Sequence, residues 1–148
     1  MSAAVYPSLK DKLVIVTGGG SGIGAGFTEG FARQGARVVF LDVAVEDSEA
    51  LVSSLSGLSP APVFKHCDLT NIAALQACFA EIAAEHGDVD VLINNAANDD
   101  RHSLAEVTPA YWDDRVAVNL RHLYFAAQAV ASKMRERGSG VIINLGSI

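Results

Sequence analysis

The 148-residue chain lacks long hydrophobic runs. Its longest unbroken aliphatic run is Leu13–Val16, whereas a membrane-spanning helix needs about 20 apolar residues. The N-terminal segment has neither the basic nor the apolar stretch of a secretory signal peptide. These absences predict a cytoplasmic protein without a membrane-spanning segment.

Cysteine and basic residues are also scarce. Cys67 and Cys78 form neither a C-x-x-C motif nor a zinc-ligand spacing, which predicts reduced thiols without a chemical role. His102 and His122 lack a third ligand at a suitable spacing, so no metal site is expected. Eleven Lys and Arg against 17 Asp and Glu give a formal net charge of −6, which disfavours nucleic acid as a partner.

Hydrophobic residues, by contrast, make up 50% of the chain, which predicts a packed core. Five β-rich apolar runs recur, at residues 13–16, 37–41, 62–67, 89–93 and 141–145. Near-continuous Val, Ile and Leu in such runs indicate strands buried on both faces. Together with the connecting segments, the runs predict an α/β protein with a parallel sheet.

The connecting segments have the spacing of amphipathic helices. Three of them place apolar residues at helical intervals and end near a glycine: residues 22–34 before Gly35, 46–56 before Gly57 and 71–86 before Gly87. No repeat or low-complexity linker interrupts them, so a single domain is expected over residues 1–148.

A longer helix is predicted over residues 109–137. Thr108 suits its N-cap, Pro109 its first position and Gly138 the position after its last turn. Its middle, residues 123–130, is unusually apolar. This stretch either belongs to the core or meets another subunit, and the second alternative predicts a homo-oligomer.

A glycine-rich loop, Thr17–Gly24, follows the first predicted strand and opens a helix. In this position glycine lets the backbone turn sharply, and the unpaired N–H groups of the helix start favour a phosphate. The loop therefore predicts a dinucleotide-binding site, and a simple tight turn is the alternative. Its candidate cofactor residues are Gly18, Ser21, Gly22, Ile23 and Gly24.

Asp42 ends the second predicted strand, eighteen residues after Gly24. At this separation a carboxylate can accept hydrogen bonds from the ribose hydroxyls of NAD. It would repel the 2′-phosphate of NADP, and Arg37 lies at the wrong end of the strand to offset that repulsion. The sequence therefore predicts NAD, with an Asp that only caps a turn as the alternative.

These residues resemble the classical short-chain dehydrogenase/reductase family. Its cofactor motif T-G-x-x-x-G-x-G is similar to Thr17–Gly24, and its N-N-A-G motif is similar to Asn94–Ala97, although Ala97 replaces the usual glycine. Its adenine-contacting aspartate corresponds to Asp68, which Leu69 follows. The resemblance implies a Rossmann-type, doubly wound parallel sheet of strand order 3-2-1-4-5 with helices on both faces.

The resemblance also assigns further residues to the site. It implies that Asn95, Ala96 and Ala97 contact the cofactor, and that the methyl of Ala97 narrows the space beside the nicotinamide or changes the local turn. It matches the family's helical asparagine, which holds a proton-relay water, to Asn119 and the family's catalytic serine to Ser147. On physical grounds alone, Asn119 could instead be a hydrogen-bonded structural residue and Ser147 a turn residue.

Within the family, several segments are most similar to bacterial NAD-dependent sugar 1-dehydrogenases: residues 6–10, 98–102, 111–113, 118–122 and 144–148. This resemblance implies oxidation of an aldose, with D-xylose expected, at its anomeric carbon to the lactone. The polar residues 98–102 suit a substrate with several hydroxyls, so Asn98, Asp99 and Ser147 are the substrate candidates. A solvated loop is the alternative for residues 98–102.

The catalytic Tyr and Lys of this family, spaced Y-x-x-x-K, follow the serine and are absent from the chain. The only such spacing is Tyr6 to Lys10, before the first strand. The chain is therefore expected to lack its C-terminal catalytic segment and to be inactive alone. The alternatives are a non-catalytic NAD-binding fragment, or a family member acting on another sugar, a ketone or an acyl thioester.

Overall fold

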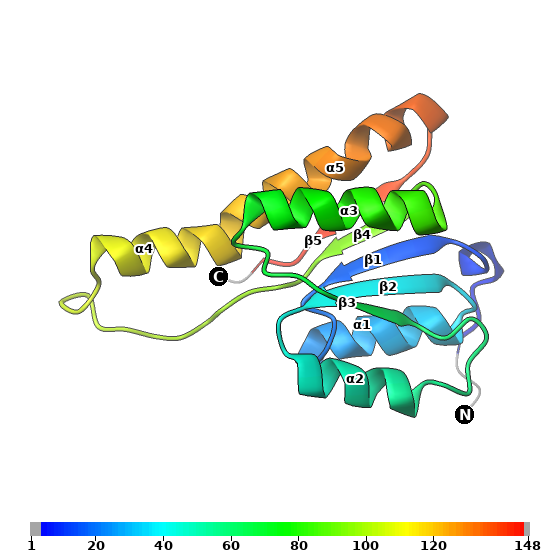
Figure 1. Ribbon diagram of the computed structural model, residues 1–148, viewed down its shortest axis with the longest axis horizontal. Coiled ribbons are helices and arrows are strands. Elements are labelled where there is room, and N and C mark those ends of the chain that lie inside the picture. Colours follow the sequence, from blue (N-terminus) through cyan, green and yellow to red (C-terminus); the bar gives the residue numbers. More distant parts are fainter. Residues whose placement is uncertain (1–3, 147–148) are drawn as a thin grey trace.

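Five parallel strands form the sheet at the centre of the computed structural model, which describes residues 4–146 (Figure 1). The strands are β1 Leu13–Thr17, β2 Arg37–Asp42, β3 Val63–His66, β4 Val91–Asn94 and β5 Val141–Asn144. Their order is β3-β2-β1-β4-β5, and every neighbouring pair is parallel. The predicted fold class and strand order are therefore confirmed.

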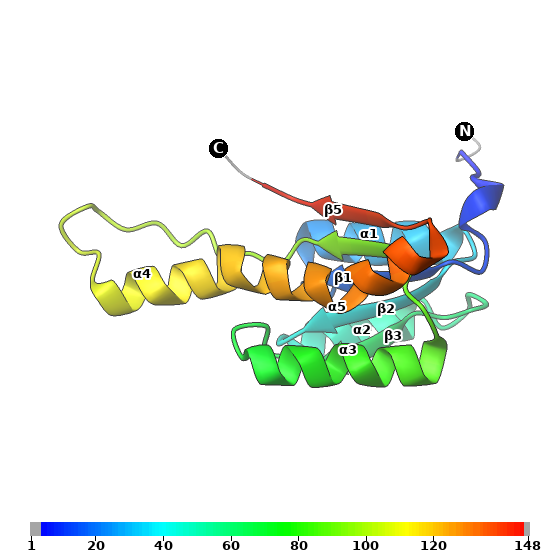
Figure 2. The same cartoon turned by 90° about the horizontal axis from the view of Figure 1, so that it is seen from above.

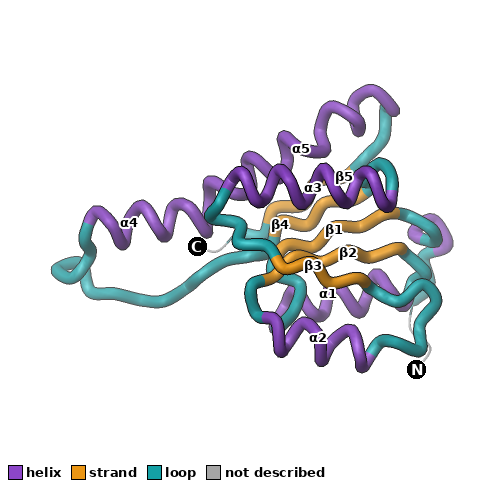
Figure 3. The backbone as a smooth tube through the Cα atoms, in the orientation of Figure 1, coloured by secondary structure: helices purple, strands orange, loops and turns teal. Residues whose placement is uncertain are grey.

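Helices connect consecutive strands, as the sequence predicted. They are α1 Gly22–Arg33, α2 Val45–Ser54, α3 Ile72–His86, α4 Pro109–Val116 and α5 His122–Arg137, with a short 3-10 helix, η1, at Pro7–Leu9. Figures 1 and 3 show α1 and α2 on one face of the sheet and α3 and α5 on the other. This arrangement covers both faces of a sheet whose central strands are apolar on both sides.

The core consists of two layers because successive strand residues point to opposite faces. Leu13 and Ile15 of β1 pack in the layer under α3 and α5, whereas Val14 and Val16 pack in the layer under α1 and α2. All four are fully buried. The alternation fixes which face of the sheet each side chain covers, and the shared direction of the parallel strands places all their carboxyl ends at one edge.

Glycines end three of the helices. Gly35, Gly87 and Gly138 have φ angles of 79°, 88° and 68°, in the left-handed region that favours glycine. The prediction that α2 extends to residue 56 is wrong, because the helix ends at Ser54 and Gly57 has no positive φ.

The predicted helix 109–137 consists of three segments rather than one. Between α4 and α5 lies a π-helical turn, η2, at Ala117–Arg121, which contains Asn119. Figure 2 shows α4 and the loop before it projecting past the sheet. Farther along α5, Ala126 and Val130 are buried, whereas Tyr124 is 65% exposed, so the apolar middle belongs only partly to the core.

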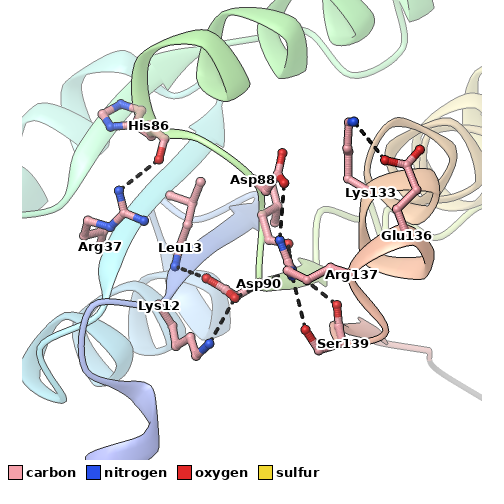
Figure 4. Close-up of polar contacts among 11 residues, drawn as sticks. Lys12, Leu13, Arg37, His86, Asp88, Asp90, Lys133, Glu136, Arg137 and Ser139 are labelled. Atoms are coloured by element: carbon pink, nitrogen blue, oxygen red, sulfur yellow. Dashed lines mark hydrogen bonds and ion pairs between the residues drawn. The ribbon is translucent and has the colours of Figure 1, made fainter.

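A charged network stabilises the amino ends of the strands (Figure 4). The Asp90 carboxylate accepts from the Leu13 backbone N–H at 2.9 Å and pairs with the Lys12 amine at 3.2 Å and with Arg137 at 3.6 Å. Burial raises the pKa of Asp90, but the Leu13 N–H and the Lys12 amine outweigh it, and the net pKa is lowered. The network joins β1, β4 and the end of α5.

Within residues 4–146, no helix is long and apolar enough to cross a membrane. In the same part of the chain, no group of three or more His, Cys, Asp and Glu side chains is arranged to hold a metal ion.

Candidate functional site

A cavity of about 610 Å³ lies at the carboxyl ends of β1, β2 and β4, the edge at which parallel α/β sheets bind ligands. Its wall includes every residue that the sequence predicted for the cofactor, and also the substrate candidates Asn98 and Asp99. The cofactor candidates are Gly18, Ser21, Gly22, Ile23, Gly24, Asp42, Asp68, Leu69, Asn95, Ala96 and Ala97. The fold therefore brings these predicted residues together.

The glycine loop turns back tightly on itself and on β4. A Cβ on Gly24 would lie 1.8 Å from the Gly18 carbonyl oxygen, and a Cβ on Gly18 would lie 2.8 Å from the Ala96 Cα. Gly18 also has a φ of 64°. These two glycines are thus required by the packing of the loop itself.

Gly22 differs, because its backbone is left-handed with a φ of 53° and a Cβ there would meet no atom within 4 Å. It begins α1, and the side chain of the N-cap residue, Ser21, accepts no hydrogen bond from the first turn. The N–H groups at this helix start therefore remain available to an anion in the cavity. The open space and the free donors fit a pyrophosphate.

The Asp42 carboxylate holds the glycine loop against the end of β2. One oxygen accepts from the Gly20 N–H at 2.8 Å, and the other accepts from the N–H groups of Val43 at 2.8 Å and Ala44 at 3.0 Å. Asp42 thus caps a turn, as the alternative interpretation had it, and it also lines the cavity. Its negative charge has a fixed position.

Asp68 follows β3 and is also held by a local turn. Its Oδ1 accepts from the Thr70 hydroxyl at 2.7 Å and from the Thr70 N–H at 2.9 Å. The Thr70 hydroxyl and N–H lower the pKa of Asp68, so this carboxylate is ionised near neutral pH.

Asn95 connects β4 to the glycine loop. Its side-chain amide donates to the carbonyl oxygens of Thr17 at 3.1 Å and Gly18 at 2.9 Å, and its backbone N–H donates to the Thr17 hydroxyl at 3.0 Å. Ala97, which replaces the family's usual glycine, has no positive φ, so its methyl group strains no backbone there.

Asn119 lies in the π-helical turn and binds the loop that follows β4. Its side-chain oxygen accepts from the Asn98 N–H at 2.7 Å, and its side-chain nitrogen donates to the Asn98 carbonyl at 2.9 Å. The side chain is therefore hydrogen-bonded on both sides, as the structural interpretation predicted. Through these two bonds Asn119 fixes one of the predicted substrate residues. Ser147 lies outside the described residues.

This geometry agrees with the comparisons with known proteins. The family model described as short chain dehydrogenase matches residues 12–148. The chain belongs to the short-chain dehydrogenase family. The family's cofactor is a nicotinamide dinucleotide, and the cavity is where its fold would hold one.

Relatives in this family include sugar dehydrogenases. The chain is 64% identical over its whole length to the D-xylose 1-dehydrogenase of Caulobacter vibrioides, and 50% identical to a probable galactose dehydrogenase of Rhizobium meliloti. It spans 58% of the length of each.

Solved structures of the family share the fold. A metagenomic short-chain oxidoreductase in complex with NADP is 35% identical with a TM-score of 0.88, and the match covers 95% of this chain and 64% of that one. A putative short-chain alcohol dehydrogenase from Sinorhizobium meliloti is 28% identical with a TM-score of 0.86, over 93% of this chain and 55% of that one.

The sequence did not predict five residues of this short-chain dehydrogenase cavity: Val43, Cys67, Thr70, Asp114 and Val118. Val43, Cys67 and Thr70 lie within two positions of the predicted Asp42 and Asp68 in the sequence, and this closeness is a signal that could have predicted them. Asp114 and Val118, four positions apart, share a helix face whose direction depends on the π-helical turn.

Proposed function

We propose that the full-length protein is an NAD-dependent sugar dehydrogenase that oxidises an aldose, with D-xylose as the expected substrate, at its anomeric carbon to the lactone. The similarity to a D-xylose 1-dehydrogenase and to a probable galactose dehydrogenase supports the substrate class. We further propose that residues 1–148 form one dinucleotide-binding domain, which binds NAD but has no turnover without the Tyr and Lys of the family.

The position of Asp42 is the observation that carries the choice of NAD. Three N–H groups hold its carboxylate at the cavity wall, so it cannot turn away from a ligand. Accepting three bonds leaves the carboxylate room to accept another from a ribose hydroxyl. A 2′-phosphate would meet this fixed charge, and no Lys or Arg is among the described residues that line the cavity.

The other cavity residues fit the remaining parts of NAD. The start of α1 around Gly22 would donate N–H groups to the pyrophosphate, and Asp68 and Leu69 would contact the adenine. When bound, the nicotinamide supplies the hydride acceptor of the reaction. The chain's own contribution is to orient it against the loop after β4, where Ala96 and Ala97 line the cavity.

On the substrate side, the Asn98 side-chain amide would donate hydrogen bonds to sugar hydroxyls or accept them, and the Asp99 carboxylate would accept them. We assign Ser147 a hydrogen bond to the anomeric oxygen, which strengthens as negative charge develops there. Asn119 positions the loop through Asn98 and, in the proposed proton relay, holds a water that leads to solvent.

We propose a homo-oligomer as the working form of the protein. Trp112, Leu120 and Tyr124 lie along α4, η2 and α5, and each is more than 60% exposed. Large apolar side chains along one helical segment are typical of a subunit interface.

Calorimetric titration of the full-length protein with NAD and with NADP tests the cofactor. NAD is expected to bind at least roughly 100-fold more tightly, which corresponds to about 2.7 kcal/mol. Equal binding of both cofactors would contradict the role of Asp42. The 148-residue chain, assayed in parallel with D-xylose, is expected to form no NADH.

A further inference from the structure

The substrate candidates Asn98 and Asp99 belong to the substrate loop, residues 98–102, which lies between β4 and α4. Figure 2 shows this loop and α4 projecting together past the sheet. Asn119 of η2 binds the main chain of Asn98, at the start of the loop. The rest of the substrate loop therefore depends on the side chains of α4 for its position.

Tyr111, in the first turn of α4, binds the middle and the end of the substrate loop. Its hydroxyl donates to the Asp100 carbonyl oxygen at 2.8 Å. The His102 ring lies against the Tyr111 ring, with 4.0 Å between the ring centroids. One tyrosine thus holds the loop at two places, through two different parts of its side chain.

Arg115, one helical turn further along α4, adds an ionic contact. Its guanidinium lies 3.6 Å from the Asp100 carboxylate and 2.7 Å from the carboxylate of Asp114, which lines the cavity. It also lies over the Tyr111 ring, 5.1 Å from the centroid. The Arg115 side chain is only 21% exposed, so water and salt screen these contacts less than at an open surface. Tyr111 and Arg115 together fix both the main chain and the side chain of Asp100.

Asp100 in turn orients the Asn98 side chain. The Asp100 N–H donates to the Asn98 side-chain oxygen at 2.9 Å. Among residues 4–146, no group accepts a hydrogen bond from the Asn98 side-chain nitrogen. Since Asn98 lines the cavity, this NH2 group is available to a ligand there, and it can only donate.

We propose that Tyr111 and Arg115 are positioning residues of the substrate site, which through Asp100 present the Asn98 side-chain amide as a hydrogen-bond donor to the sugar. This inference rests on the proposed function. The Asn98 NH2 group donates to a sugar oxygen, and the Asp99 carboxylate beside it accepts from a hydroxyl. A donor and an acceptor on adjacent residues suit neighbouring sugar hydroxyls, each of which can both donate and accept.

Hydrogen–deuterium exchange of the full-length protein tests whether Tyr111 and Arg115 hold the substrate loop. Tyr111→Phe removes only the hydroxyl, and Arg115→Met removes the charge but keeps a long side chain. Each should speed the exchange of the amide hydrogens in the loop at least roughly threefold, as expected when one hydrogen bond of ordinary strength is lost. Tyr6→Phe and Arg135→Met are the matched controls, because both residues lie outside the substrate loop and the cavity wall.

Steady-state kinetics with D-xylose at saturating NAD test the effect on the substrate. In Tyr111→Phe and Arg115→Met, KM for D-xylose should rise at least roughly threefold, while the Kd of NAD stays within about twofold. A residue that only stabilises the fold would change the concentration of active enzyme, which lowers the apparent kcat and leaves KM unchanged.

Asn98→Asp tests the donor role separately. This variant keeps the oxygen that accepts from the Asp100 N–H and replaces the NH2 donor by an acceptor. Its KM for D-xylose should rise at least roughly tenfold, without faster exchange in the substrate loop.

Three results overturn the proposal. One is an unchanged KM in Tyr111→Phe and Arg115→Met. Another is a raised KM without faster exchange of the substrate loop, which would mean that the two residues act by a different route. The third is an unchanged KM in Asn98→Asp, which would exclude the donor role. If the unsubstituted protein oxidises no aldose, the proposed function fails and the sugar contact with it, whereas the exchange measurement still decides whether Tyr111 and Arg115 hold the loop.

Discussion

Removal of the Asp42 carboxylate is the most informative single change. In Asp42→Ala, the ribose hydroxyls lose a charged acceptor, which contributes about 1.5–3 kcal/mol per hydrogen bond. NAD affinity should therefore fall roughly 10- to 100-fold. NADP affinity should rise, because the fixed negative charge at the cavity wall is gone. The ratio of NAD affinity to NADP affinity should therefore decrease, because the first falls and the second rises.

Calorimetric titration with both cofactors measures the two affinities. Thermal unfolding measures how much the substitution destabilises the glycine loop. Asp42→Ala also removes the acceptor of the N–H groups of Gly20, Val43 and Ala44, so a lower Tm is expected. Asp47→Ala is the matched control, because Asp47 is an exposed carboxylate in the first turn of α2 and lies outside the cavity. NAD affinity within twofold of the original in a folded Asp42→Ala protein would refute the reasoning.

Three further changes test the loop and the charges. Gly24→Ala should abolish NAD binding because its Cβ would lie 1.8 Å from a carbonyl oxygen, whereas Gly26→Ala, with no atom within 4 Å, should preserve binding in the same titration. Asp90→Asn should lower the free energy of unfolding by about 1–3 kcal/mol at neutral pH. The folded pKa of Asp90 is below its unfolded value of about 3.9. The difference in the free energy of unfolding between the original protein and Asp90→Asn should therefore vanish as the pH falls through the folded pKa. Urea unfolding at several pH values measures this difference. Burial lowers the pKa of His122, so the free energy of unfolding should decrease below about pH 6.5, by up to about 1.4 kcal/mol per pH unit. His122→Phe should remove that decrease.

Each of these predictions has a contrary outcome. Normal NAD binding by Gly24→Ala would mean that the loop does not close as described. A destabilisation of Asp90→Asn that persists below the folded pKa of Asp90 would arise from packing rather than charge. An unchanged pH slope in His122→Phe would assign the slope to another group.

The fold was predictable because its signals are local. The apolar runs, the glycines at helix ends and the loop before α1 each depend on a few neighbouring residues. Asp42 was predictable for the same reason, because a strand end places it beside the glycine loop. The π-helical turn was not predicted from periodicity, since it inserts one residue into a pattern that otherwise reads as a single helix.

Contacts between distant segments account for what the sequence left open. The bonds from Asn119 to Asn98 join residues 21 positions apart, and their existence depends on how α4 and the loop meet. Cys67 and Cys78 have no motif spacing, and only the packing of α3 on the sheet places both in one core cluster. Such pairings follow from tertiary structure, which a pattern along the chain does not record.

The most direct test of the proposed function is the formation of NADH by the full-length protein, followed by its absorbance, with D-xylose and a panel of other aldoses. The proposal predicts NADH formation with NAD and D-xylose, and far less reduced cofactor with NADP. No NADH with any aldose, together with oxidation of NADPH by a ketone or an acyl thioester, would contradict it.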